Sequence, residues 1–340
     1  MTTAPHNRHP CVVTPARGTG RSSYDVSVVI PTRNRRRLLL RAIDSVLAQT
    51  YPVQEIIVVD DASDFDVAAC LEGVYEPSVA RKIHVVTNPT NVGGATSRNL
   101  GAARATGDLV AFLDSDDFWL PEKLEKQVRL LRAEPVVGLV YCDVLRVDAA
   151  GHRLESNRCL FDQDIWQHLL DGWIAFPNTS SLVFRKSVFR ALGGFDTDLP
   201  SCQDHDLWMR VGLNAIAVRY VAEGLYVVGD DARDRISTDY PKRMAGVRRF
   251  LDKWRSHLLS RGPRHFREFM QQYLVTAAFD VFASKLRARQ FSSAATIYCD
   301  NFVVNPFFYR RLTGRLTMLV LRPLFAGRGR GRAGSRTPTE

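Results

Sequence analysis

The sequence predicts an α/β fold in which a mixed, mainly parallel sheet is followed by a helical C-terminal region. Runs of apolar, β-branched residues stop abruptly at polar or turn-forming residues, as the strands of a parallel sheet covered on both faces do. Between these runs, apolar residues recur at helical spacing, which is typical of alternating strands and helices. Beyond about residue 240 only helical patterns remain. With 340 residues, 45% hydrophobic and 24% charged, the chain has a globular composition.

Four strands are predicted in the first 120 residues. They are the runs VSVVIPTRNR at 26–35, EIIVVDD at 55–61, IHVVTNPTN at 83–91 and LVAFLD at 109–114. The helix after the first strand places its apolar residues on one face: Leu38, Leu39, Ala42, Ile43, Val46 and Leu47. A second helix is expected at 95–106. Residues 136–147 are expected to form a further strand, and residues 176–196 a strand that runs into a helix.

Polar residues follow three of the four strands. They are Thr32 to Asn34 after the first, Asp60 and Asp61 after the second, and Asp114 to Asp116 after the fourth. The carboxyl ends of parallel strands meet at one edge of the sheet, where open α/β sheets bind their ligands. The pattern therefore predicts a nucleotide site at this edge.

The acids at 114, 116 and 117 form the densest of these groups. Three carboxylates in four residues repel one another, and a hard cation would relieve the repulsion. Mg²⁺ and Mn²⁺ typically bind one or two carboxylates together with phosphate oxygens. The alternative is an acidic turn that caps a helix starting near Pro121. The sequence leaves both interpretations open at this point.

A second acidic group lies downstream, in GGFDTDLPSCQDHDLWMRV at residues 193–211. Asp204 and Asp206 are expected to open a helix with an apolar face. First-turn acids suit the helix dipole, and Asp204 is also a candidate N-cap. The functional interpretation makes Asp204 a general base, with Asp206 as the next candidate.

Together these motifs resemble the inverting, non-processive family 2 glycosyltransferases of GT-A fold. VSVVIPTRNR, IIVVDDASD, NVGGATSRNLGAARATGDLVAFLDSDD and GGFD followed by QDHDLWMRV occur in the family's order. The resemblance covers residues 25–240. It implies transfer of one sugar from a nucleotide diphosphate sugar of UDP or dTDP type, with inversion and with Mn²⁺ or Mg²⁺ on the diphosphate. The implied acceptor is a hydroxyl of a glycan or lipid-linked precursor.

The resemblance also implies roles for individual residues. Asp204 is the expected catalytic base, although Gln203 stands where the family usually has Glu. Asp116 is expected to bind the metal, with Asp114 on the metal or the ribose. The expected donor-binding residues are Pro31, Thr32, Asn34, Asp60, Asp61, Arg98, Asp114, Ser115 and Asp116. Asp60 or Asp61 would accept a hydrogen bond from the base, and Arg98 either contacts phosphates or is simply solvated.

The net charge of +10 lies entirely in the two ends of the chain. Residues 1–24 carry +3 and residues 306–340 carry +7, so the remainder is neutral. A neutral centre argues against an extended nucleic-acid surface. The basic, apolar segment at 306–326 is expected either to pack as a terminal helix or to lie on an anionic membrane surface.

Four regions are therefore expected: a disordered arm at 1–24, the catalytic domain at 25–240, a helical region at 241–326 and a disordered basic tail at 327–340. Six scattered cysteines, no secretory signal and no spanning segment suggest a cytoplasmic enzyme, peripheral on the inner face of the membrane. The favoured function is a hexosyltransferase-type glycosyltransferase of cell-surface polysaccharide or glycolipid synthesis. The competing classes are a nucleotide-sugar-binding protein without transfer activity and a nucleotidyltransferase.

Overall fold

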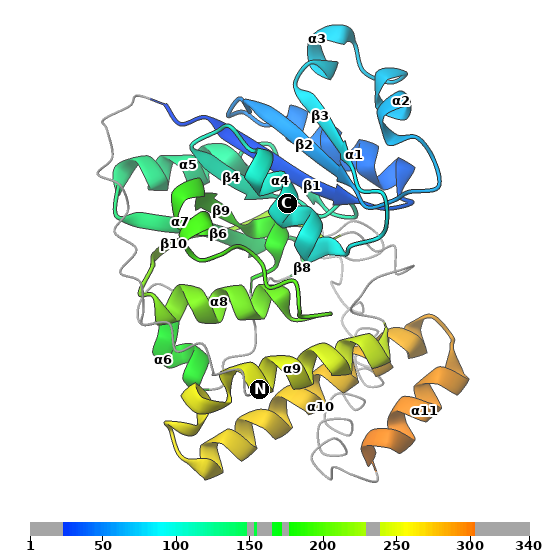
Figure 1. Cartoon of the computed structure of the whole chain (residues 1–340), viewed down its shortest axis with the longest axis vertical. Coiled ribbons are helices and arrows are strands. Elements are labelled where there is room, and N and C mark those ends of the chain that lie inside the picture. Colours follow the sequence, from blue (N-terminus) through cyan, green and yellow to red (C-terminus); the bar gives the residue numbers. More distant parts are fainter. Residues whose placement is uncertain (1–22, 148–152, 155–164, 172–176, 229–238, 303–340) are drawn as a thin grey trace, which may run out of the picture.

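The computed structural model describes residues 23–147, 153–154, 165–171, 177–228 and 239–302. An eight-stranded sheet forms the upper part of the molecule in Figure 1, and a layer of helices lies below it. The strand order is β3-β2-β1-β4-β9-β6-β10-β5. The first four strands of this order run parallel, whereas β9 is antiparallel to both its neighbours. The predicted mixed, mainly parallel sheet is confirmed.

The strands of this sheet are β1 (Val26–Thr32), β2 (Glu55–Asp60), β3 (Ile83–Thr87), β4 (Leu109–Phe112), β5 (Phe118–Trp119), β6 (Val137–Val144), β9 (Val183–Arg185) and β10 (Ala217–Val227); β7 (Arg146–Val147) and β8 (Arg153–Leu154) pair separately. The helices of the sheet region are α1 (Arg36–Leu47), α2 (Val67–Glu72), α3 (Pro77–Ala80), α4 (Gly94–Arg104), α5 (Lys123–Ala133), α6 (Ile165–Leu170), α7 (Lys186–Ala191) and α8 (Gln203–Leu213). The helical region contains α9 (Tyr240–Leu259), α10 (Pro263–Arg287) and α11 (Phe291–Phe302).

The two faces of the sheet pack against different helices. Neighbouring residues of β1 illustrate this, because Val28 belongs to the core on the side of α1 and α5, and Val29 to the core on the side of α4 and α8. Both cores exclude solvent, and β1 and β2 are buried almost throughout. The prediction of burial on both faces is wrong for β3. This strand is only half-buried because it is the edge strand of the sheet.

Helix α4 approaches the sheet unusually closely at Gly101. A Cβ atom there would lie 2.4 Å from Cγ1 of Val29 and 3.1 Å from Cγ2 of Val59. Only glycine fits this contact, since real Cβ atoms do not approach carbon atoms so closely. The close packing fixes α4 over β1 and β2, and with it the start of the helix near the carboxyl ends of both strands.

The acidic segment after β4 does not cap a helix. Strand β5 separates it from α5, which begins at Lys123 with Glu122 at its N-cap. The interpretation of Asp114 to Asp117 as a cap for a helix near Pro121 is therefore wrong. The segment is instead a connection between two strands of the same sheet.

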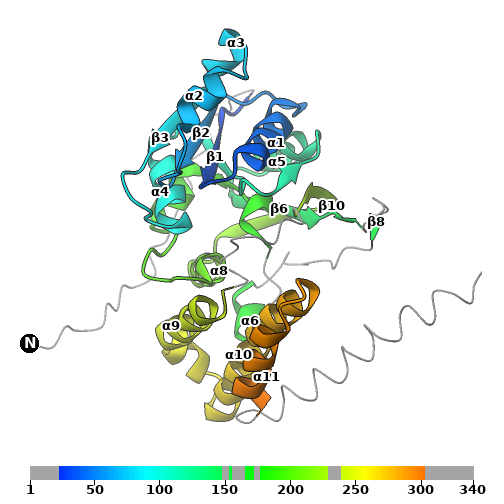
Figure 2. The ribbon, with the colours of Figure 1, turned by 90° about the vertical axis from the view of Figure 1, so that its right-hand side faces the viewer.

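The C-terminal helices share a core with the sheet domain. Figures 1 and 2 show α8 between the sheet and the antiparallel pair α9–α10. One continuous hydrophobic cluster runs from Phe112 on β4 through Trp208 on α8 to Phe250 and Trp254 on α9. Within the described ranges no helix is long and apolar enough to cross a membrane. The segments predicted at 306–326 and 327–340 lie outside the described residues, as do residues 1–22.

Candidate functional site

Ser180, in the short 3₁₀ turn Thr179–Ser181, is hydrogen-bonded to the acidic segment that follows β4, Asp114 to Asp117. The N–H of Asp114 donates to Ser180 Oγ over 3.0 Å, and Ser180 Oγ donates to Asp117 Oδ2 over 2.7 Å. The indole N–H of Trp119 donates to the Ser180 carbonyl over 2.8 Å. Asp117 therefore has a structural partner, and the turn at 178–181 supports the acidic segment.

Three arginines converge on the same segment. Arg98 donates from Nε to Asp114 Oδ1 over 3.1 Å and from Nη2 to the same oxygen. Arg35 Nη1 lies 3.2 Å from Asp116 Oδ1, and Arg41 Nη2 donates to the Asp116 carbonyl over 2.6 Å. The Arg98 side chain is only 13% exposed, so the solvated alternative for this residue is wrong.

The carboxyl end of β1 carries an unsatisfied hydroxyl. Thr32 is 3% exposed, and its Oγ1 has no hydrogen-bond partner among the described residues. Pro31 precedes it and is half-buried. A buried hydroxyl without a partner is costly in a folded protein, and a ligand that supplies one removes that cost.

Asn34 braces the loops that follow β1 and β2. Its backbone adopts a positive φ of 53°, which asparagine tolerates better than most residues. Its N–H donates to Ser63 Oγ over 3.0 Å, and its Oδ1 accepts from the N–H of Asp64 over 2.8 Å. In the structure Asn34 thus shapes the loops around the predicted nucleotide site.

Asp60 and Asp61 are both buried but differ in their hydrogen bonds. Asp61 accepts from the N–H groups of Val92 and Gly93 over 2.8 and 2.9 Å, and from Asn88 Nδ2 over 3.2 Å. Asp60 accepts from the N–H of Ser63 over 3.0 Å. A carboxylate has about four acceptor positions. Asp61 uses most of its acceptor positions for hydrogen bonds from the loop before α4, so Asp60 has more acceptor positions left for a ligand.

The chemistry of Asp114 and Asp116 suits a divalent cation that also binds phosphate. The two side chains flank Ser115, which is 2% exposed, at the carboxyl edge of the sheet. Within the described residues no group of three His, Cys, Asp or Glu side chains is arranged to hold a metal by itself. Mg²⁺ usually takes one or two carboxylates and completes its shell with substrate phosphates and water. The residues present fit this second pattern.

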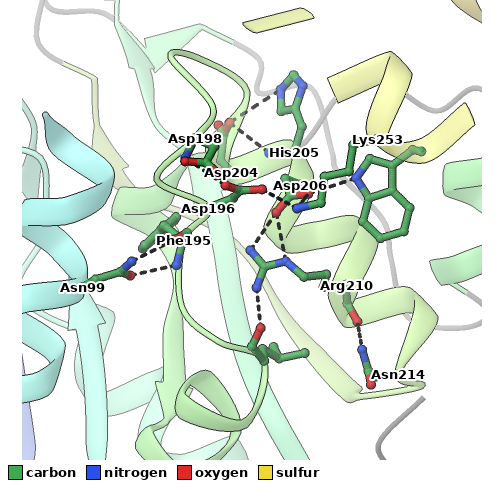
Figure 3. A network of polar contacts seen from close by, with 12 residues as sticks. Asn99, Phe195, Asp196, Asp198, Asp204, His205, Asp206, Arg210, Asn214 and Lys253 are labelled. Atoms are coloured by element: carbon green, nitrogen blue, oxygen red, sulfur yellow. Dashed lines mark hydrogen bonds and ion pairs between the residues drawn. The ribbon is translucent and has the colours of Figure 1, made fainter. Parts of the chain in front are cut away.

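Asp204 lies in the first turn of α8, facing the loop at residues 196–198 in Figure 3. It is not the N-cap, since Cys202 with a φ of 64° occupies that position. Its side chain is 27% exposed, and its Oδ1 accepts from the N–H of His205 over 3.0 Å. Asp204 is therefore a carboxylate accessible to solvent at the end of a helix.

His205 belongs to α8 and not to a loop. Its Nδ1 contacts the hydroxyl of Tyr273 on α10, and its ring packs against Phe250 on α9. Burial lowers the pKa of His205 to about 4, although the nearby Asp204 carboxylate opposes this shift. The imidazole is neutral at physiological pH, so it places no positive charge beside Asp204.

Asp206 is a fully buried structural carboxylate. It accepts from Arg210 Nε over 2.9 Å and from the Trp254 indole over 2.9 Å, and it pairs with Lys253 Nζ over 2.7 Å. Lys253 also pairs with Asp196 (Figure 3). Burial raises the pKa of Asp196, but the hydrogen bond from Lys253 and smaller effects hold it below its ordinary value. This network joins α8 to α9 and leaves Asp206 poorly suited to act as a base.

Asn99 joins the motif before the acidic segment to the motif before α8. Its Nδ2 donates to the Phe195 carbonyl over 2.8 Å, and its Oδ1 accepts from the Phe195 N–H over 2.8 Å (Figure 3). Gly194 has a φ of 71°, and a Cβ there would lie 2.5 Å from Asn99 Oδ1. Asn99 and Gly194 therefore have structural roles that explain their place in the two motifs.

Sequence reasoning missed three contacts at this site, those that Arg35, Arg41 and Ser180 make with the acidic segment. The run RNRRR directly after the first strand places several arginines near the predicted nucleotide edge, which is a signal for the first two. Which arginine reaches the acidic segment depends on the direction of α1. For Ser180 the sequence indicates an acceptor-side segment or a plain polar turn at 178–181, but its contact with the acidic segment depends on the antiparallel pairing of β9 with β4.

The chain is similar to known proteins in both sequence and fold. The model of glycosyl transferase family 2 matches residues 27–193. Bacillus subtilis EpsE, named as a glycosyltransferase, is 30% identical over 217 residues, which cover 62% of this chain and 75% of that protein. An uncharacterized glycosyltransferase of Haemophilus influenzae is 28% identical over 192 residues, covering 55% of this chain and 61% of its own length.

One further relative and two solved structures extend the comparison. TuaG of Bacillus subtilis, named for teichuronic acid biosynthesis, is 43% identical over 106 residues, covering 31% of this chain and 41% of that protein. The mannosyltransferase PcManGT of Pyrobaculum calidifontis, with GDP-Man and Mn²⁺, shares the fold with a TM-score of 0.54 at 20% identity, over 92% of this chain and 89% of that one. S. aureus TarS 1–349 with UDP gives 0.50 at 19% identity, over 76% and 80%. The chain belongs to glycosyltransferase family 2 and has its GT-A fold.

Proposed function

We propose that the protein transfers one sugar from a nucleotide diphosphate sugar to a hydroxyl of a cell-surface glycan or a lipid-linked precursor. Family membership supports the reaction class. The relative named for teichuronic acid biosynthesis supports a cell-surface polysaccharide as the product class. The structural neighbours hold UDP and GDP-Man, which supports a nucleotide diphosphate sugar as the donor.

The observation that carries the proposal is the arrangement at the carboxyl edge of the sheet. Asp114 and Asp116 follow β4, and the unsatisfied hydroxyl of Thr32 ends the neighbouring strand β1. The backbone at Pro31 and Thr32 would hold the ribose, and the Asp60 carboxylate would accept a hydrogen bond from the nucleobase. A nucleotidyltransferase normally carries a Gly-rich, basic loop directly after its first strand. The connection here, PTRNRRR, supplies basic residues but no glycines, which disfavours that class.

A divalent cation would be held by Asp116, with Asp114 beside it. When bound, such a cation neutralises charge that develops on the departing diphosphate. Mn²⁺ in the mannosyltransferase neighbour supports this choice, and Mg²⁺ has the same ligand preference. The chain contributes the two carboxylates and two hydrogen bonds that hold their backbone in place: the Asp114 N–H donates to Ser180 Oγ, and Arg41 donates to the Asp116 carbonyl.

Asp204 would remove the proton from the acceptor hydroxyl. Its partly exposed carboxylate is the accessible acid of its segment, whereas Asp206 is buried under several donors. The neutral His205 leaves the basicity of Asp204 undiminished by a neighbouring positive charge. A single base on the acceptor side suits direct displacement, which inverts the configuration of the transferred sugar.

The test is a panel of nucleotide sugars, with UDP-, dTDP- and GDP-linked donors, incubated with the full chain and Mn²⁺. We expect binding and slow hydrolysis of one donor, because water replaces the acceptor in a transferase active site. A donor that binds without any turnover, also with glycan acceptors present, would favour a binding protein without transfer activity. Retention of configuration in the product would contradict the role given to Asp204.

A further inference from the structure

We propose that Arg35 pairs with Asp116 in the free protein and moves to the donor diphosphate when a divalent cation binds Asp116. Binding of the divalent cation and binding of the nucleotide therefore favour each other. Arg35 directly precedes α1 and follows β1, within the loop that lies beside the predicted donor site. Its guanidinium meets Asp116 Oδ1 at 3.2 Å. This inference rests on the proposed function, since it assigns a new residue to the proposed donor site.

The two side chains are placed for a strong interaction. Asp116 is 10% exposed and Arg35 is 21% exposed, so water screens their attraction less than it would on the surface. Arg41 fixes the backbone of Asp116 through its carbonyl, which limits the freedom of the carboxylate to turn away. Arg41 Nε is itself buried without a hydrogen-bond partner among the described residues. Helix α1 therefore carries, next to the acidic segment, a guanidinium N–H that no described acceptor uses.

A divalent cation and Arg35 compete for the same carboxylate. A cation that binds Asp116 through Oδ1 must displace the guanidinium, and two positive charges beside one carboxylate also repel one another. Arg35 consequently weakens the binding of a cation alone. Since the described residues contain no three-ligand metal group, such a cation also lacks the further ligands that a phosphate would supply.

With a diphosphate present, Arg35 no longer opposes cation binding but supports it. Its oxygens accept two parallel hydrogen bonds from a guanidinium, the geometry that arginine matches best. Once a cation takes Asp116, Arg35 has a new acceptor, and the diphosphate gains a cationic ligand. Each ligand thus favours the other. Coupling of this kind is reciprocal and typically spans 5- to 150-fold in affinity.

The experiment measures Mn²⁺ binding without nucleotide by the electron paramagnetic resonance signal of free Mn²⁺. We expect Arg35→Gln to tighten Mn²⁺ binding on the order of 10-fold, and to weaken UDP or GDP binding in saturating Mn²⁺ by a similar factor. The matched control is Arg36→Gln, which removes the same charge one residue away. The Arg36 side chain is exposed and makes no hydrogen bond or ion pair within the described part of the chain, so both affinities should stay unchanged.

A second variant changes Asp116 instead of Arg35, and its nucleotide binding is measured without metal. In excess EDTA, Asp116→Asn should bind the same nucleotide more tightly than the wild type, because Arg35 loses its carboxylate partner. Arg35→Lys provides a further check that keeps the charge, and its nucleotide affinity should lie between those of the wild type and Arg35→Gln.

Each alternative result has a distinct meaning. If Arg35→Gln weakens Mn²⁺ binding, Arg35 orients Asp116 for the cation and the exchange is wrong. If Arg35→Gln and Arg36→Gln change the affinities equally, the effect is long-range charge and the assignment of Arg35 is also wrong. If the wild type binds neither Mn²⁺ nor any nucleotide of the panel, the proposed function itself fails.

Discussion

Asp116 and Asp204 have different surroundings, and the expected effects of changing them differ accordingly. Asp116 is almost buried and pairs with Arg35, whereas Asp204 is partly exposed beside a neutral histidine. We expect Asp116→Ala to abolish turnover and chelation to do so reversibly, because the departing diphosphate loses its cation. Activity assays in EDTA followed by Mn²⁺ addition test this. Full activity in excess chelator would show that no metal is needed.

The second residue-scale prediction concerns Asp204→Asn. Loss of a general base should lower kcat on the order of 10²- to 10⁴-fold and leave donor affinity unchanged. Asp198→Asn is a suitable control, since Asp198 lies in the neighbouring exposed loop and, among the residues that the structure describes, only its backbone is hydrogen-bonded. Steady-state kinetics with a separate donor-binding isotherm distinguishes the two variants. Unchanged kcat with weaker donor binding would show that Asp204 is not the catalytic base.

At the scale of elements, α8 depends on the helices that follow it. Asp206→Asn removes a charge that Lys253 and Arg210 both neutralise, and it leaves these cations with less compensation. Breaking a buried ion pair typically costs on the order of 3–5 kcal/mol in the free energy of unfolding. Chemical denaturation should show this loss for Asp206→Asn and little for Asp204→Asn. Equal stability of both variants would contradict the structural role of Asp206.

The contact of α8 with α10 gives a dependence of stability on pH. The pKa of His205 is lowered to about 4 in the folded protein, while the unfolded chain takes up a proton near 6.5. The unfolded state therefore binds more protons below pH 6.5, and stability falls as the pH decreases towards 4. His257, whose pKa burial also lowers, adds to the effect. His205→Phe should flatten this loss in thermal melts at pH 4–7; an unchanged pH profile would contradict the assignment.

Elements with strong local patterns could be predicted, and those defined by distant contacts could not. The runs of β-branched residues in β1, β2 and β4 indicate buried strands, because each run can be recognised from its own residues alone. The exposed positions of β3 arise from its place at the sheet edge, which depends on strand order. Likewise Arg98 was identifiable as a candidate, but its pairing with Asp114 requires the close packing of α4 at Gly101.

At the scale of the whole molecule, the helical region is joined to the sheet domain through its core and through Lys253. The basic segment at 306–340 lies beyond the described residues, and its attachment to membranes stays a prediction. Deleting 306–340 should release the protein from anionic liposomes at low salt, since each arginine near such a surface contributes about 1 kcal/mol. Donor hydrolysis should be unchanged. A full-length protein that ignores these liposomes would contradict the membrane role.

The insertion of β9 between β4 and β6 has a consequence for biosynthesis. Strand β4 ends at Phe112, but its partner β9 is not complete until Arg185 has been made. At about 5–20 residues per second, the ribosome leaves this strand edge unpaired for roughly 4–15 s. An unpaired, apolar strand edge is a site for aggregation. The nascent chain should therefore need chaperone protection at this stage, and truncations that end before Arg185 should accumulate as insoluble protein.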